Sequence, residues 1–405
     1  MVRLLVPAAA LLAACGGEAE EAQQIAAVSS APTETEAANT RLKGAFPGQT
    51  RAPTMRANVA VDVQEVTAAL DSPWSLEFLA DGQVLVTEKG GAFRIVSRDG
   101  KVSEPGTGLP RVDDRGQGGL LDVALDPDFA SNRTIWWTFS EPRKGGNGTA
   151  LARGRLSLGA RPDVSDVQIV FRQMPTFDSE LHYGSRIAFA PDGKLFLTLG
   201  ERSERESRVR ARDVATHFGK VIRLNRDGSV PTDNPFAGQA GALPGIWSVG
   251  HRNPQGIAFR DDGSLWVIEH GPRGGDELNR IERGRDYGWP TITYGIEYGG
   301  ETIGKGVAAA PGLEQPVYYW DPVIAPSSLL FYDGVMFPEW KGSFFATALN
   351  GKLVRLTMKG DRVAGEEWLL RDRGGERYRD ARQGPDGAIW LVTDEGKLLR
   401  VARRS

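Results

Sequence analysis

Four short, widely separated segments of this sequence share one pattern, an Asp-Gly pair followed by a run rich in apolar residues. The pairs are Asp81-Gly82, Asp192-Gly193, Asp262-Gly263 and Asp386-Gly387. Asp-Gly supplies the positive φ that a tight hairpin turn needs, and alternating apolar residues mark a strand with one buried face. The recurrence of one hairpin type along the chain predicts an all-β protein built from similar units.

A recurring hairpin of this kind is typical of a β-propeller, although its spacing here is irregular. Six blades would take roughly 58 residues each, which leaves room for long loops on one face. The strand-like segment from Asn58 to Val66 could pair with a final strand near Leu398 to Ala402 and close the ring. We therefore predict a six-bladed propeller over residues 58–405. A pair of β-sandwiches is the alternative, and it gives less reason for the repeated hairpin.

The first 57 residues differ from the rest. A short positive start precedes an apolar run, and Leu12–Cys15 (LAAC) resembles the lipid-attachment box of bacterial lipoproteins. We interpret residues 1–15 as a signal peptide and Cys15 as a lipidated N-terminus; an ordinary signal peptide with an incidental cysteine is the alternative. Residues 16–57 are rich in Ala, Glu, Thr, Ser and Pro, which predicts a disordered tether. The protein would lie on the periplasmic side of the cell envelope, with membrane contact only through Cys15.

Composition and missing motifs exclude several classes of function. Lysine plus arginine total 49 against 52 aspartates and glutamates, so the net charge of −3 indicates no nucleic-acid partner. Cys15 is the one cysteine, which excludes an internal disulfide and a thiolate metal cluster. The chain has no G-x-S-x-G elbow, Walker loop, H-E-x-x-H or Rossmann glycine motif. Redox chemistry would therefore need a cofactor held by loops.

His182 is the first candidate for proton transfer. It lies directly before an apolar strand, and a neutral imidazole, with a pKa of about 6.5, can accept a proton from an alcohol. Glu201 ends the next strand, where its carboxylate could hydrogen-bond the ring and fix its tautomer. A histidine buried only for packing is the alternative interpretation.

Arginines beside flexible backbone indicate an anionic ligand. Arg252 and Asn253 share a turn bounded by glycines, and Arg377 and Arg379 lie on one face of an extended segment. Guanidinium groups bind carboxylates in a bidentate manner, so three of them favour a ligand with several negative charges. Surface ion pairs with neighbours such as Asp380 are the alternative.

The segment from Glu269 to Glu277 (EHGPRGGDE) is a candidate metal site. It offers backbone carbonyls on a constrained turn, with two acidic residues at its end. Oxygen-rich loops of this kind suit calcium, although the spacing is not that of an EF-hand.

Several ordered motifs carry a family resemblance. They are Gly116–Leu121 (GQGGLL), His182–Arg186 (HYGSR), Gly219–Gly228 (GKVIRLNRDG), Gly250–Gly256 (GHRNPQG), His270–Asn279 (HGPRGGDELN), Asp286–Pro290 (DYGWP), Ile324–Ser327 (IAPS) and Arg377–Asp380 (RYRD). From Pro73 to the C-terminus, the chain resembles the soluble quinoprotein sugar dehydrogenases of the glucose/sorbosone dehydrogenase family, and most of all their aldose sugar dehydrogenase branch.

This resemblance implies a six-bladed propeller that binds pyrroloquinoline quinone (PQQ) and calcium at one face. His182 would deprotonate the C1 hydroxyl of an aldose, with Glu201 as the partner of its ring. Backbone oxygens of Gly271 and Pro272 would bind the catalytic calcium. The residues that would hold PQQ are Gln117, Arg252, Asn253, Asn350, Arg377 and Arg379, and Glu277 and Tyr287 match a second, structural calcium site.

Two of these positions depart from the family pattern. Glu201 stands where the family usually has aspartate, and its longer arm could still reach His182. Asn350 takes the place of a cofactor-binding lysine, which removes a positive charge from the PQQ site. Lys352, two residues further along and on the same face of a strand, could substitute for it.

The leading hypothesis is an enzyme that oxidises an aldose at C1 to its lactone with PQQ and calcium. Electrons would pass to an external acceptor. A calcium-dependent lactonase or sugar hydrolase is the second hypothesis, and a non-catalytic propeller that binds sugar or protein is the third.

Overall fold

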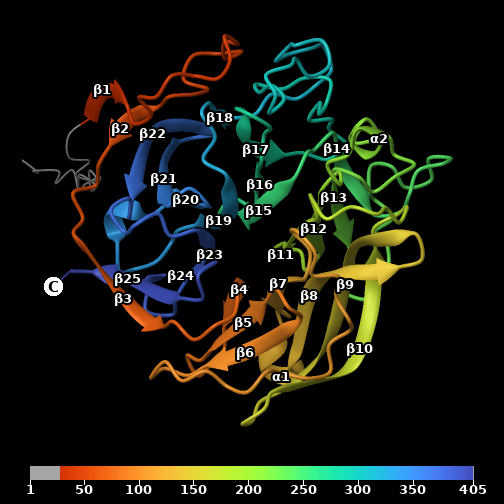
Figure 1. Cartoon of the computed structure of the whole chain (residues 1–405), viewed down its shortest axis with the longest axis vertical. Coiled ribbons are helices and arrows are strands. Elements are labelled where there is room, and N and C mark those ends of the chain that lie inside the picture. Colours follow the sequence, from red (N-terminus) through yellow and green to blue (C-terminus); the bar gives the residue numbers. More distant parts are fainter. Residues whose placement is uncertain (1–27, 405) are drawn as a thin grey trace, which may run out of the picture.

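The computed structural model describes residues 28–404, which form six β-sheets arranged as the blades of a closed ring (Figure 1). The prediction of an all-β, six-bladed propeller is confirmed, and a pair of β-sandwiches is excluded. The predicted signal peptide, Cys15 and the first part of the predicted tether lie outside the described residues. The described part of the chain contains no helix with the length and apolar character needed to cross a membrane.

The blades follow one another along the chain, and the first strand of each blade contacts the first strands of its two neighbours around the axis. The first three blades contain β4 (Pro73–Phe78), β5 (Val84–Glu88) and β6 (Ala92–Val96); β7 (Leu120–Leu125), β8 (Thr134–Arg143), β9 (Gly146–Ser157) and β10 (Asp163–Arg172); and β11 (Gly184–Phe189), β12 (Leu195–Leu199), β13 (Lys220–Leu224) and β14 (Ile246–Val249). The other three contain β15 (Pro254–Phe259), β16 (Leu265–Glu269), β17 (Asp276–Ile281) and β18 (Tyr318–Trp320); β19 (Pro326–Phe331), β20 (Phe344–Ala348), β21 (Lys352–Lys359) and β22 (Arg362–Leu369); and β23 (Tyr378–Gln383), β24 (Ile389–Thr393) and β25 (Leu398–Arg403). The short helices are α1 (Phe129–Asn132), α2 (Arg205–Arg208) and the 3-10 turn η1 (Pro338–Trp340).

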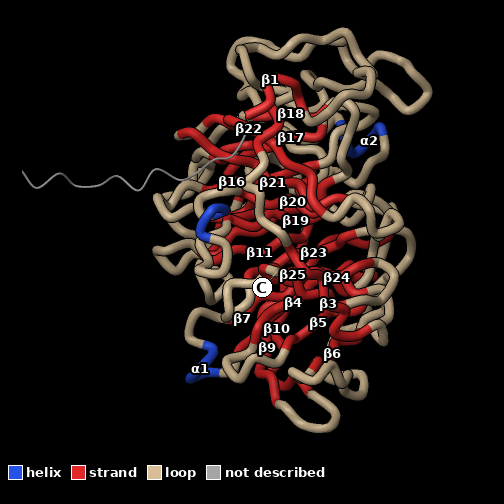
Figure 2. Tube along the Cα trace, turned by 90° about the vertical axis from the view of Figure 1, so that its left-hand side faces the viewer, coloured by secondary structure: helices blue, strands red, loops and turns tan. Residues whose placement is uncertain are grey.

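The four Asp-Gly pairs all occupy the same place, the turn between the first and second strands of a blade. Their glycines have φ values between 78° and 81°. In each turn the aspartate carboxylate accepts a hydrogen bond from the backbone N–H two residues further along, at 2.8 to 3.1 Å. Short turns therefore close this end of the inner hairpins, and the connections that enter the inner strands lie at the opposite end. Figure 2 shows these loops on both sides of the strand layer.

The ring closes as the sequence predicts. β3 (Val61–Thr67) pairs antiparallel with β25, and Val63 lies opposite Val401. The last blade therefore combines strands from both ends of the propeller. This pairing within one blade holds the two ends of the propeller chain together and so closes the ring.

A single buried arginine connects the inner strands around the axis. Arg186 on β11 is 1% exposed, and its guanidinium lies 4.1 Å from the ring centre of Trp74 on β4. Its other partners are Asp122 on β7 (3.0 Å), Asp380 on β23 (2.9 Å), the carbonyl of Gln255 on β15 (2.9 Å) and the carbonyl of Ser327 on β19 (2.6 Å). Arg186 thus fixes the spacing of six inner strands at once.

The N-terminal segment corrects the predicted domain boundary. Residues 28–57 lie against the propeller: β1 (Val28–Pro32) pairs with β2 (Pro53–Met55), and β2 adds to the edge of β22 at Thr54 and Glu366. Gln49 and Ala52 are each 1% exposed. The predicted disorder over residues 16–57 is therefore wrong for residues 28–57. The composition of this segment is that of a tether, but its polar groups hydrogen-bond to the propeller.

Candidate active site

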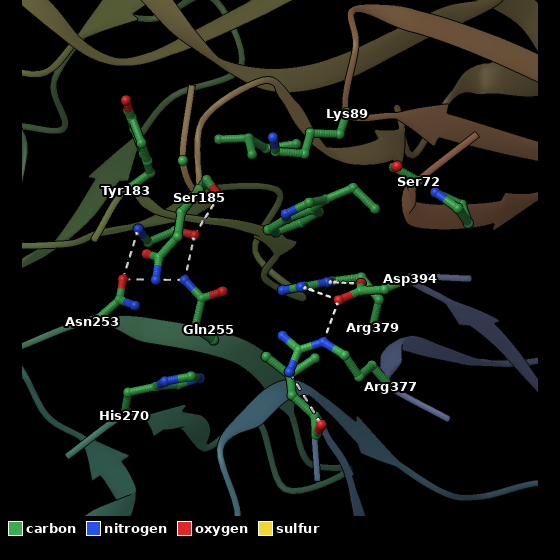
Figure 3. A pocket seen from close by; sticks show the side chains of 17 residues that line it. Ser72, Lys89, Tyr183, Ser185, Asn253, Gln255, His270, Arg377, Arg379 and Asp394 are labelled. Carbon is green, nitrogen blue, oxygen red and sulfur yellow. Dashed lines mark hydrogen bonds and ion pairs between the residues drawn. The ribbon is translucent and has the colours of Figure 1, made fainter. Parts of the chain in front are cut away.

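A cavity of about 320 Å³ lies at the end of the ring where the inner strands begin (Figure 3). Most of its lining comes from residues at the starts of β4, β7, β11, β15 and β23 or directly before them. The lining includes Trp74, Lys89, Gln117, Gly184, Ser185, Asn253, Gln255, His270, Arg377, Arg379 and Asp394.

One side of the cavity is positively charged. Arg377 and Arg379 both bind Asp394, with Nε–carboxylate distances of 2.8 and 2.7 Å. Burial opposes ionisation of Asp394, but hydrogen bonds from the two arginines hold its pKa below the ordinary value. Lys89 adds a third cation, and its Nζ donates to the carbonyl of Asp114 at 2.7 Å. Three cations face one carboxylate, so an anionic ligand would be attracted here.

Two amides stand opposite these cations, as Figure 3 shows for Asn253 and Gln255. The Asn253 side-chain oxygen accepts hydrogen bonds from Gly184 N (3.1 Å) and Gln255 Nε2 (3.2 Å). Gln255 Nε2 also donates to the Gly184 carbonyl at 3.1 Å. Their orientations are therefore fixed, and Asn253, which the resemblance assigns to PQQ binding, lines the cavity.

His182 is held beside this cavity by its neighbours. Its backbone N–H donates to Gln117 Oε1 at 2.9 Å, and Gln117 lines the cavity. His182 has a left-handed φ of 51°, a conformation that non-glycine residues adopt only when their surroundings impose it. The chain passes close to His182 at Gly200, where a Cβ would lie 2.1 Å from the His182 carbonyl oxygen, so this position requires glycine.

The predicted partnership of His182 and Glu201 is present. His182 Nδ1 lies 3.2 Å from Glu201 Oε1, and both side chains are buried. Nε2 has no hydrogen-bond partner among residues 28–404. Burial and the nearby Arg252 lower the pKa of His182 below 6.5, and they outweigh the opposing effect of Glu201. The imidazole is therefore neutral at pH 7, with the proton on Nδ1 and a free lone pair on Nε2.

Arg252 faces a neighbouring hollow rather than the main cavity. This hollow is lined by Arg252, Glu269, His270, Gly271, Glu277 and Tyr287, among others, and His270 lines both spaces. Arg252 donates to the His270 carbonyl at 3.2 Å, and its backbone N–H donates to Glu269 at 2.7 Å. Its buried Nε has no hydrogen-bond partner in the described part of the chain. The predicted site residues are thus divided between two adjoining spaces.

Within the predicted calcium segment Glu269–Glu277, the turn Gly271–Gly275 folds tightly on itself. A Cβ on Gly271 would lie 2.2 Å from Gly275. Asp276 accepts hydrogen bonds from Gly271 N (2.8 Å), Ile324 N (2.8 Å) and Ala325 N (2.7 Å), while burial raises its pKa to about 7. Within residues 28–404, no hydrogen bond reaches the carbonyls of Gly271 and Pro272. Both residues are buried, and Gly271 lines the smaller hollow, whereas Pro272 lines neither of the two spaces.

The second predicted metal position is only partly assembled. Glu277 and Tyr287 both line the smaller hollow, but the Tyr287 hydroxyl donates to the Arg280 carbonyl at 2.6 Å. Burial and the nearby Glu269 raise the pKa of Glu277 well above its ordinary value. Among the described residues, no cluster of three or more His, Cys, Asp or Glu side chains could hold a metal. Backbone oxygens would have to provide much of any coordination.

Asn350 and Lys352 lie outside the cavity lining. Asn350 is exposed and donates to the Val323 carbonyl at 3.3 Å. The Lys352 ammonium lies 3.7 Å from the ring centre of Trp368, so the suggestion that Lys352 could replace the family lysine is wrong. From this turn it is Leu349 that lines the cavity, and its carbonyl accepts a hydrogen bond from Arg377 at 3.4 Å.

Several lining residues were not expected from the sequence, among them Trp74, Lys89, Gln255 and Asp394. Gln255 lies inside the quoted GHRNPQG motif, and Trp74 lies at the start of the resemblance, so both had a signal. Lys89 precedes a Gly-Gly pair, and Asp394 lies in an ordinary Asp-Glu-Gly turn. Nothing in the local sequence distinguishes those two from surface charges.

Several known proteins are similar to this chain in sequence and in fold. The protein is 44% identical over 357 residues to the aldose sugar dehydrogenase YliI of Escherichia coli K12, covering 86% of this chain and 95% of that protein. The crystal structure of the apo-form of the soluble aldose sugar dehydrogenase from Escherichia coli superposes with a TM-score of 0.81 at 43% identity, covering 85% of this chain and 100% of that chain. The PQQ-bound aldose sugar dehydrogenase of Streptomyces coelicolor superposes with a TM-score of 0.70 at 28% identity, covering 85% and 99% of the two chains.

The family match covers most of the propeller. The sequence model of the Glucose / Sorbosone dehydrogenase family matches residues 70–400, which include every residue of the cavity described above. The chain therefore belongs to the glucose/sorbosone dehydrogenase family.

Proposed function

We propose that this protein is a sugar dehydrogenase that oxidises an aldose at C1 to its lactone, using PQQ and calcium, and passes the electrons to an external acceptor. The observation that carries the proposal is a cavity with excess positive charge beside a neutral, oriented imidazole. Support also comes from the relatives named as aldose sugar dehydrogenases, one of which has PQQ bound.

The lining fits the chemistry of PQQ, which carries three carboxylates and an ortho-quinone. Arg377, Arg379 and Lys89 would hold carboxylates, and Gln117 and Asn253 would bind polar edges of the ring system. The carbonyls of Gly271 and Pro272 would bind calcium. When bound, PQQ supplies a two-electron acceptor and calcium supplies a Lewis acid that polarises it.

The chain's own contribution to the reaction is proton transfer and orientation. Glu201 keeps the proton of His182 on Nδ1, so that Nε2 can accept the proton of the sugar C1 hydroxyl. The lowered pKa of His182 means that this base is already free at neutral pH. Glu201 acts only through His182 and is a positioning residue.

One group of buried side chains resembles the catalytic triad of a hydrolase. Ser248 Oγ lies 2.9 Å from His251 Nε2, and His251 Nδ1 lies 3.0 Å from Glu269, which is the order of a Ser-His-Glu triad. Ser248 and His251 are 0% exposed, and His251 stacks on Tyr287 at 4.7 Å. A substrate could not reach this serine, so the geometry favours a structural role that fixes Glu269.

The test is reconstitution of the purified apoprotein with PQQ and calcium chloride, followed by glucose and a redox dye. Sugar-dependent reduction of the dye is expected. His182→Ala should lower the rate by at least about 100-fold, because the general base is lost, while PQQ binding persists. Unchanged turnover in His182→Ala would contradict the mechanism. Lactone hydrolysis without PQQ would select the hydrolase, and sugar binding without either activity would select a binding propeller.

We also propose a location in the cell envelope, on the periplasmic side, with a lipid on Cys15. The support is the LAAC sequence after a short apolar run. Cys15→Ser should move the protein from the membrane fraction to the soluble fraction and abolish labelling by radioactive palmitate. Equal labelling of the variant would contradict the anchor.

A further inference from the structure

An N-terminal strap, residues 33–55, crosses the outside of the candidate site. It lies beyond residues 70–400, which match the family. In Figure 1 it is the red-orange segment at the upper left, beside β22. Several of its contacts fall on two residues, Asp321 and Tyr294, which form two walls beside the Gly271–Gly275 turn.

The first wall is Asp321, which follows β18. The Asp321 carboxylate accepts hydrogen bonds from the backbone and side chain of Asn39, at 2.8 Å each, and from those of Thr40, at 3.0 and 3.1 Å. Asp321 is 3% exposed. Both of its oxygens are thus satisfied by the strap, and a buried carboxylate that lost these donors would be costly.

The second wall is Tyr294, in the long connection between β17 and β18. Its hydroxyl donates to Gln49 Oε1 at 2.9 Å, and its carbonyl accepts a hydrogen bond from Thr40 at 3.3 Å. Gln49 Nε2 donates to the Pro316 carbonyl at 2.7 Å. Gln49 therefore binds this connection at two points, Tyr294 in its interior and Pro316 near its end.

The turn lies directly between these walls. Gly275 N donates to the Trp320 carbonyl at 2.8 Å, and Arg273 exchanges two backbone hydrogen bonds with Ile296, each 3.0 Å long. A Cβ on Gly274 would lie 2.9 Å from Asp321 Oδ1, and a Cβ on Gly295 would lie 2.3 Å from the Gly274 carbonyl. Arg273 also donates to Asn39 Oδ1 at 3.0 Å. Movement of either wall would therefore move the turn.

We infer that the strap is a positioning element for the metal site: Asn39, Thr40 and Gln49 hold Asp321 and Tyr294 so that the carbonyls of Gly271 and Pro272 converge on calcium. This inference rests on the proposed function. The strap, whose composition is that of a linker, would thus support a metal site formed by residues more than 200 positions away in the chain.

The test compares Asn39→Ala/Thr40→Ala with Thr33→Val in the full chain. Thr33 belongs to the strap, but it hydrogen-bonds to the Glu366 carbonyl at 2.8 Å and to Thr54, away from the turn. The unfolding midpoint of apoprotein without PQQ is measured against calcium concentration. The double variant should need about tenfold more calcium for half of the midpoint shift, as is typical when a support of a metal ligand is lost. Thr33→Val should match the unaltered protein.

Amide hydrogen exchange of residues 270–276, measured without calcium, provides a second readout. Faster exchange there is expected in the double variant and in the milder Thr40→Val, which removes the Thr40 hydroxyl but retains the Asn39 side-chain donor to Asp321. Equal calcium dependence and equal exchange in these variants would overturn the positioning role, as would an equal effect of Thr33→Val. If the unaltered protein shows no calcium response, the proposed calcium site fails, and the positioning role fails with it.

Discussion

At the scale of single residues, the protonation of His182 depends on a balance of opposing effects. Burial lowers its pKa most, followed by the positive charge of Arg252, whereas Glu201 raises it. Burial and Arg252 prevail, so the pKa lies below 6.5 and the base is neutral at pH 7. Activity should therefore persist below pH 6.5 and fall as the pH decreases through the lowered pKa.

Glu201→Gln tests this balance. Loss of the carboxylate charge should lower the pKa of His182 further, so the acidic limb of the kcat/KM profile should move to lower pH. The rate at pH 7 should fall roughly tenfold or more, because the base becomes weaker and loses its orientation. A pH profile of the reconstituted enzyme from pH 4 to 8 provides the measurement. An acidic limb that moved to higher pH would contradict the account.

The sequence predicts those site residues whose position is fixed by local chain geometry. His182 lies just before β11 and Glu201 lies just after β12, so the pairing of these two strands brings them together. Arg377 and Arg379 are two residues apart in an extended segment and therefore share a face. The direction of Asn350 does not follow, because a turn residue has no such periodicity. Arg252 lies in the smaller hollow, where its guanidinium is 5.3 Å from the ring centre of Trp289, and local sequence does not encode a contact between positions so far apart.

At the scale of elements, the Asp-Gly hairpins were predictable because the turn and its hydrogen bond span only a few residues. The strap was not, because its stabilising contacts are distant: Asn39 binds Asp321, and Thr33 binds Glu366. A segment of polar residues has the same composition whether it is solvated or held by a partner. Its order becomes evident only when the partner surface is known.

Closure of the ring by β3 and β25 should carry a measurable share of stability. Leu399 on β25 is 0% exposed, and Leu399→Ala should destabilise the protein by about 2–5 kcal/mol through the cavity it leaves. Arg400, its neighbour on the opposite face, pairs with the exposed Asp386, and Arg400→Ala should cost less than about 1 kcal/mol. Urea unfolding of both variants measures the difference. Equal free energies of unfolding would contradict a closure role for this strand face.

At the scale of the whole molecule, the axis of the ring holds a cluster of opposite charges. The cluster comprises Arg186 and Arg382 with Glu77, Asp122 and Asp380, one carboxylate more than the cations can balance. Burial raises the pKa of Glu77 to about 7, despite the opposing effect of Arg382. Protonation of Glu77 would bring the cluster to neutrality.

Glu77→Gln should therefore stabilise the protein at alkaline pH. In the native chain, the stability contributed by the protonated form is complete below the unfolded pKa of 4.5 and is lost as the pH rises through about 7. Glutamine mimics the protonated form, and because the side chain is 27% exposed we expect a gain of about 1–2 kcal/mol at pH 8. Urea unfolding at pH 4.5 and pH 8 measures the gain, which should vanish at pH 4.5. A variant less stable than the native protein at pH 8 would contradict this.

Calorimetric titration of PQQ into calcium-loaded protein tests directly whether the cavity is a cofactor site. The cavity should bind one PQQ, and Arg379→Ala should weaken binding at least about tenfold, because a charged contact to a carboxylate is lost. Arg403→Ala, which removes a cation from the distant end of β25, should leave the affinity unchanged. Equal affinity of Arg379→Ala and the unaltered protein, or no binding of PQQ at all, would contradict the account.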